Sequence, residues 1–158
     1  MAITLRVVGT FYQNENIAVP SGSTVKDVLD YAQANPTGTS TSSSASAFGY
    51  SVNMASGGSS VMSFSVTYDQ CFNSITSGMA YPAGTYFLAE NMQSSPVYSV
   101  WQFYVQDADG KPVAYNPRIT FFDQPNAIVP DNGTVTWRLV NLLTGPNVAP
   151  KPAQQRLS

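Results

Sequence analysis

The sequence predicts an α+β fold that is mostly β, with a mixed sheet packed on one helix. Three observations support this fold class. Residues 24–35 have the apolar periodicity of a helix. After Pro36 the apolar runs are short or alternate with polar residues, as is typical of strands. Gly, Pro, Asn and Asp fall between these runs, where turns are expected.

The first two elements are predicted to be strands joined by a hairpin. Ile3, Leu5 and Val7 alternate with their neighbours at the period of a half-buried strand. The short apolar run at 17–19 predicts the second strand. The segment 9–16, which is polar towards its end, predicts the connection between them.

The helix has signals at both ends and along one face. Thr24, with Asp27 three residues later, resembles a capping box. The dipeptide Asn35-Pro36 ends the helix, because proline disfavours the helical conformation in the residue before it. Four apolar residues share the spacing of one buried face: Val25, Val28, Leu29 and Ala32. A strand, a hairpin, a second strand and a packed helix are the start of a β-grasp-like fold.

The rest of the chain is predicted to add strands and turns to a single domain, residues 1–144. Strands are expected at 48–54, 61–68, 85–90, 97–106, 112–123 and 134–140. Turn residues separate them at 81–84, 107–110 and 130–133. Because Pro117 interrupts one of these strands, we expect an edge or a bend there. The Ser/Thr-rich segment 37–47 is predicted to be a loop, and residues 145–158 an extended C-terminal tail.

Alternation within the strands predicts which side chains are buried. One predicted inward face is Met62, Phe64, Val66 and Tyr68. In the strand 97–106 the inward residues are Val97, Trp101, Phe103 and Val105, and the opposite face carries Tyr98, Val100, Gln102 and Tyr104. Trp137 and its neighbours Val135 and Leu139 point inward in the last strand. We therefore expect both tryptophans to pack in the core.

Three separated segments resemble the transcobalamin C-terminal-like β-grasp domain. They are PSGSTVKDVLDYA, SVWQFYVQDADGKPV and IVPDNGTVTWRLV, in that order. The resemblance implies a mixed β-grasp sheet packed on one helix, often in an extracellular module, and a relative that binds a corrinoid. The Ser/Thr insert and the long region 50–90 depart from the family's pattern, so no ligand contact is carried over. The chain also ends without the Gly-Gly that a ubiquitin-like carrier needs.

Composition limits the partners. Only 10% of the 158 residues are charged, against roughly 25% in typical soluble domains. Seven basic and nine acidic residues supply no electrostatic footprint for nucleic acid and no basic cluster for a membrane surface. No apolar run approaches the about 20 residues that span a bilayer. We expect other protein subunits as partners, in a homo- or hetero-assembly. An ordinary, weakly charged soluble domain is the alternative.

Catalytic and metal chemistry is not expected. The chain has no histidine, which excludes hydrolases of the Ser-His-Asp and Cys-His forms. Its one cysteine, Cys71, is predicted to be a small buried thiol. Asp107-x-Asp109 begins like a calcium loop, but Arg118 stands at the twelfth position, where a Glu is required. We predict a protein that is not an enzyme and has no cofactor or metal.

The candidate interface lies on the outer face of the strand 97–106 and in the tail. Tyr98, Gln102 and Tyr104 share that face, and tyrosine is enriched at protein interfaces. Coverage of this face by a loop or a second layer of the same chain is the alternative. The tail candidates are Pro150, Pro152, Arg156 and Leu157. Because segments of this composition are mobile in isolated domains, we expect neighbouring subunits to hold them.

These observations predict a non-enzymatic structural or interaction module. It would be a subunit or an accessory surface component of a larger assembly, such as a virion or a multi-subunit complex. A small-ligand, corrinoid-like binding module and an extracellular adhesin-type domain are the alternatives. The N-terminus starts directly with a strand and shows no signal peptide. Localisation therefore stays open between a virion or cytoplasmic assembly and the cell exterior after removal of a leader.

Overall fold

The structure is a computed structural model that describes residues 2–37, 45–73, 78–91, 97–113 and 121–143. A four-stranded mixed sheet forms one of its layers. Its strands are β1 (Ile3–Val7), β2 (Tyr12–Ile17), β8 (Val97–Gln106) and β9 (Thr134–Leu143), in the order β2-β1-β9-β8. The central strands β1 and β9 are parallel, and each has an antiparallel partner outside it. The sheet is mixed and a helix follows the first hairpin, as the sequence predicted.

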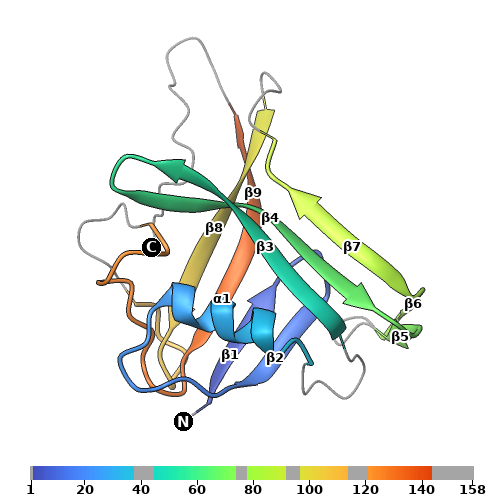
Figure 1. Ribbon diagram of the computed structural model, residues 1–158, viewed down its shortest axis with the longest axis horizontal. Coiled ribbons are helices and arrows are strands. Elements are labelled where there is room, and N and C mark those ends of the chain that lie inside the picture. The colour runs from blue at the N-terminus through green and yellow to red at the C-terminus, as the bar shows by residue number, and fades with distance from the viewer. Residues whose placement is uncertain (1, 38–44, 74–77, 92–96, 114–120, 144–158) are drawn as a thin grey trace.

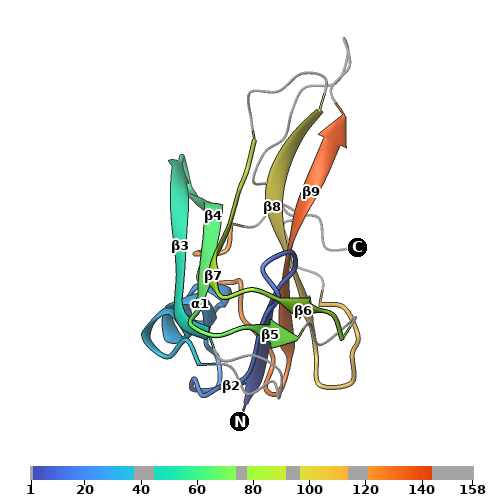
Figure 2. The same cartoon turned by 90° about the vertical axis from the view of Figure 1, so that its right-hand side faces the viewer.

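The second layer consists of one helix and a three-stranded antiparallel sheet, as Figures 1 and 2 show. The helix is α1 (Val25–Ala34), and the sheet has the order β3 (Ala45–Ala55), β4 (Gly58–Tyr68), β7 (Gly84–Ala89). Two short strands, β5 (Phe72–Asn73) and β6 (Ala80–Tyr81), pair with each other. The fold is thus mostly β with one helix on a mixed sheet, as predicted, and the extra strands form a sheet of their own.

Aromatic side chains fill the space between the two layers. Phe64 of β4 meets Trp101 of β8 and Trp137 of β9 edge-on, with ring centroids 4.8 and 5.3 Å away. All three side chains are at most 1% exposed. The four apolar residues predicted for the inner face of α1 are fully buried as well. Edge-to-face packing adds to the burial of apolar area, so this aromatic cluster joins the layers. The predicted core role of both tryptophans is confirmed.

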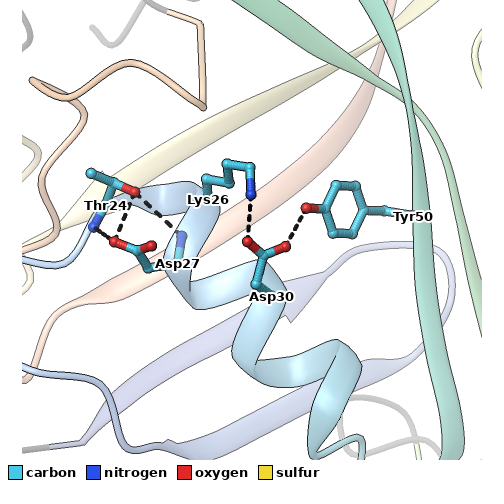
Figure 3. A network of polar contacts seen from close by, with 5 residues as sticks. All are labelled: Thr24, Lys26, Asp27, Asp30 and Tyr50. Carbon is cyan, nitrogen blue, oxygen red and sulfur yellow. Dashed lines mark hydrogen bonds and ion pairs between the residues drawn. The ribbon is translucent and has the colours of Figure 1, made fainter.

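The predicted helix ends are confirmed. The Thr24 hydroxyl accepts a hydrogen bond from the backbone N–H of Asp27 at 3.3 Å (Figure 3). The Asp27 carboxylate accepts one from the backbone N–H of Thr24 at 2.9 Å. This reciprocal capping box satisfies donors that the first helical turn leaves without partners. Asn35 is the C-terminal cap, directly before Pro36.

The second strand begins earlier than predicted. β2 starts at Tyr12, so the polar residues 13–16 lie inside the strand, and the turn contains Gly9 and Phe11, both with positive φ. Asn14 is only 1% exposed, because its amide donates hydrogen bonds to the Tyr12 hydroxyl at 3.1 Å and to a backbone carbonyl at the end of the helix. A satisfied polar side chain can be buried. Because Asn14 is polar although it is buried, it interrupts the alternation of apolar residues from which a strand is predicted.

One residue of β4 that was predicted to be buried is exposed. Met62 is 37% exposed, and its neighbour Val61 is buried instead. Ser51 pairs with Ser63, but the next residue of β3, Val52, pairs with Val61. Met62 is therefore the extra residue of a β-bulge, which reverses the alternation before it. The other three residues predicted for this face are buried as expected.

One further burial prediction is wrong, and one alternative left open by the sequence gains support. Val100 lies on the outer face of its strand, as predicted, and it is fully buried there. It lies opposite Val140 of β9, so that end of the outer face is apolar. Cys71 is exposed rather than buried. It directly precedes β5, and the inward position there belongs to Phe72, since successive side chains of a strand point to opposite sides.

The predicted strand at 112–123 is not found in its described parts. Pro112 forms only an isolated bridge to Gln106, and residues 121–123 form a turn. The predicted loop at 37–47 is shorter at its end, because β3 begins at Ala45. Residues 38–44 and the predicted tail 145–158 lie outside the described residues.

Candidate interaction surfaces

The outer face of the four-stranded sheet carries the described part of the predicted interface. The strand register places Tyr104, Thr136 and Arg6 side by side across β8, β9 and β1. In the neighbouring row, Gln102 lies opposite Arg138. The Tyr104 hydroxyl donates a hydrogen bond to the Gln102 side-chain oxygen at 2.9 Å. Two of the predicted interface residues are thus in contact on a half-buried surface.

The other predicted interface residues are Tyr98 and four residues of the tail. The side chain of Tyr98 and residues 150, 152, 156 and 157 lie outside the described part of the structure.

Two arginines on this face were not predicted as site residues. Arg6 and Arg138 are both exposed, and within the described residues neither forms an ion pair. Arg138 lies two residues beyond Thr136, the partner of Arg6, so the two arginines are diagonal neighbours on adjacent strands. Alternation places Arg138 on the outer face from sequence alone. Only the parallel pairing of the first and last strands brings Arg6 beside it.

A shallow depression of about 270 Å³ opens between these side chains. Arg6, Arg138, Thr136 and Gln106 supply its polar groups, and Tyr104 and Pro112 add apolar surface. Burial raises the pKa of Tyr104, while the positive charge of Arg138 opposes that shift. The Tyr104 hydroxyl therefore remains protonated at neutral pH and keeps its hydrogen bond to Gln102.

The outer face of the three-stranded sheet has a different chemistry, with small uncharged side chains. Gly49, Ser65 and Phe87 form one row across it, and Thr67 and Thr85 lie in the next row with their hydroxyl oxygens 2.8 Å apart. Phe87 is 61% exposed. This face points away from the four-stranded sheet, so the two outer faces lie on opposite sides of the molecule (Figure 2).

Strand β7 is the edge of this sheet, as Figure 1 shows. The backbone N–H of Glu90 donates to the Met62 carbonyl at 2.8 Å. Because backbone groups alternate in direction along an antiparallel strand, those of residue 90 and of every second residue before it point towards β4. The backbone groups of Thr85, Phe87 and Ala89 consequently point away from the sheet. Within the described residues no other strand pairs with Thr85, Phe87 or Ala89 on this side. Asn91, two residues beyond the strand, forms an isolated bridge to Ser99 of β8. The strand contains neither charge nor proline, which are common means of protecting an exposed edge.

The described residues carry no group of three or more His, Cys, Asp or Glu side chains that could hold a metal. The segment that begins like a calcium loop folds as a turn. A carboxylate oxygen of Asp107 accepts hydrogen bonds from the backbone N–H groups of Asp109 and Lys111, both at 2.9 Å. Among the helices that the structure describes, none is long and apolar enough to cross a membrane.

Comparison with protein-family models, curated proteins and solved structures found no match to this chain. The resemblance to the transcobalamin C-terminal-like domain stays a prediction, and the site has to be interpreted from its own geometry.

Proposed function

We propose that this protein is a non-enzymatic interaction module that joins a larger protein assembly, such as a virion surface or a multi-subunit complex. The observation that carries the proposal is the uncharged edge of β7, which no strand among the described residues covers and which exposes Phe87 in its middle. Edge strands without charge or proline invite pairing with another chain.

Backbone chemistry supports this mode of contact. An extended partner segment can add to the sheet by hydrogen bonds to the outward N–H and C=O groups of Thr85, Phe87 and Ala89. Each such bond contributes about 0.5–1.5 kcal/mol net. Covering the Phe87 side chain, of which 61% is exposed, contributes about 1–2 kcal/mol more. The two rows described on the adjoining face, Gly49-Ser65-Phe87 and Thr67-Thr85, contain no charged side chain, so the contact does not require desolvation of a charge there.

A second copy of the chain is the first partner to test. An antiparallel pair of β7 strands with a two-fold axis at Phe87 would place Thr85 of one copy opposite Ala89 of the other. The two phenylalanines would then be direct cross-strand neighbours, an arrangement that stabilises antiparallel pairs.

Sedimentation velocity of the purified chain over a wide concentration range tests the proposal. We expect reversible association, which Phe87→Lys abolishes by placing a charge at the edge. Met54→Lys is the matched control, because Met54 is 87% exposed at the far end of β3. Equal association of the wild type and Phe87→Lys, or equal loss in both variants, would contradict a role for this edge.

A further inference from the structure

We propose that the depression on the outer face of the four-stranded sheet binds a small organic carboxylate, held by Arg6 and Arg138. This proposal does not depend on the proposed function, because the depression lies on the opposite side of the molecule from the outer face of β3, β4 and β7 (Figure 2).

The charge of Arg6 and Arg138 indicates an anionic ligand. Acidic residues outnumber basic ones in this chain, nine to seven, yet the described part of the structure pairs neither Arg6 nor Arg138 with a carboxylate. A guanidinium stays charged at any physiological pH and presents a fixed fork of donors that matches two carboxylate oxygens. Two such forks on adjacent strands place two positive charges beside the depression.

The size of the depression limits the ligand. Its volume of about 270 Å³ is below the roughly 300–1,000 Å³ of pockets that hold drug-sized molecules. It exceeds by several-fold the about 30 Å³ that one water molecule occupies. A single small molecule fits such a space.

The lining favours an organic acid over an inorganic anion. Thr136 adjoins Arg6 across the strands and adds a hydroxyl group to the two guanidinium groups. Tyr104 and Pro112 add apolar surface. The carbon skeleton of an organic acid can pack against this surface, whereas inorganic phosphate has no apolar part that could do so. Since the Tyr104 hydroxyl already donates to Gln102, the ring of Tyr104 rather than its hydroxyl would contact the ligand.

An NMR titration of the full chain with benzoate, at constant ionic strength, tests the proposal. Benzoate joins a carboxylate to a compact apolar ring. We expect saturable shifts of the backbone amides of Arg6, Thr136 and Arg138, with a dissociation constant on the order of 1 mM because both arginines are exposed. Formate and phosphate are run in parallel, and each should bind more weakly because neither has an apolar body.

Four variants separate a built site from general charge attraction. Arg6→Gln and Arg138→Gln should each weaken benzoate binding about tenfold. Arg138→Lys keeps the charge but loses the fork, and should fall between the wild type and Arg138→Gln. Lys111→Gln is the control: it removes one exposed positive charge near the depression but outside its lining, and should leave binding unchanged.

Three results would overturn the proposal: shifts that do not saturate, an equal loss in Lys111→Gln, or phosphate binding as tightly as benzoate. Because both arginines are exposed and unpaired in the described structure, the variants should keep the wild-type melting temperature, which is measured first. Phe87→Lys should bind benzoate like the wild type, so failure of this proposal is distinguishable from failure of the proposed function.

Discussion

The phenolic hydroxyl of Tyr50 donates a hydrogen bond to the Oδ1 atom of Asp30 at 2.5 Å, joining β3 to α1 (Figure 3). The other oxygen of the same carboxylate is paired with Lys26 at 2.6 Å. Burial raises the pKa of Tyr50, and the hydrogen bond to Asp30 and the charge of that carboxylate raise it further. This contact links the helix of the β-grasp-like part to the sheet that was added to it.

Replacing Tyr50 by Phe should lower the free energy of unfolding by about 1 kcal/mol, the usual net value of one hydrogen bond. The loss stays modest because Asp30 keeps its ion pair with Lys26. Urea denaturation followed by circular dichroism measures it. Tyr31→Phe on the helix is the matched control, since the Tyr31 hydroxyl makes no hydrogen bond within the described residues. Equal stability of the two variants would show that the Tyr50 bond contributes nothing.

Stability should decrease at alkaline pH. Burial raises the pKa of Tyr12 to about 12, although the hydrogen bond from Asn14 opposes the shift. Burial also raises the pKa of Tyr68. In the unfolded chain tyrosine ionises near pH 10, so above about pH 10 the native state binds more protons than the unfolded state, and the free energy of unfolding falls. Below about pH 10 this contribution is fully present.

Urea midpoints measured from neutral pH to about pH 11 test this dependence. The decline should begin near pH 10 and coincide with a late, unfolding-linked rise in tyrosinate absorbance. Tyr12→Phe should have a shallower alkaline decline than the wild type. A stability that stays constant across the whole range would contradict the prediction.

Phe64 and Phe87 lie on opposite faces of the three-stranded sheet, so their alanine variants can be compared. Phe64→Ala should cost about 3–5 kcal/mol, because it leaves a cavity between Trp101 and Trp137. Phe87→Ala should change the free energy of unfolding by less than about 0.5 kcal/mol, because its side chain is 61% exposed. Thermal and urea unfolding of both variants, at concentrations where the chain is monomeric, measure the difference. Similar losses in the two variants would contradict the two-layer core.

Gly133 lies where the turn before β9 approaches the end of β8. A Cβ atom there would be 2.6 Å from the backbone oxygen of Gln106 and 2.9 Å from that of Pro130. Gly133→Ala should therefore cost about 1–3 kcal/mol, because the neighbouring backbone has to move. Gly49→Ala is the control, with no heavy atom within 4 Å of the added methyl group. It should be neutral or slightly stabilising. The urea midpoints of the two variants test this contrast, and equal midpoints would contradict it.

Sequence alone predicted the features that depend on near neighbours in the chain. The capping box of Thr24 and Asp27 spans three residues, and the buried face of α1 repeats within two turns. The bounds of β8 were predicted residue for residue, because its run of β-branched and aromatic residues ends at the turn signals of 107–110. Gln102 and Tyr104 were placed on one face by the same alternation, and their contact agrees with it.

Tertiary structure decided the features that depend on pairing between distant segments. The bulge at Met62 arises from the register with β3, and the burial of Asn14 requires hydrogen bonds that include one to the end of the helix. Arg6 lies beside Arg138 only because β1 pairs with β9 in parallel. A side-chain pattern is local and records which way each residue points. The identity of its neighbour across the sheet depends on the register, which the whole chain sets when it folds.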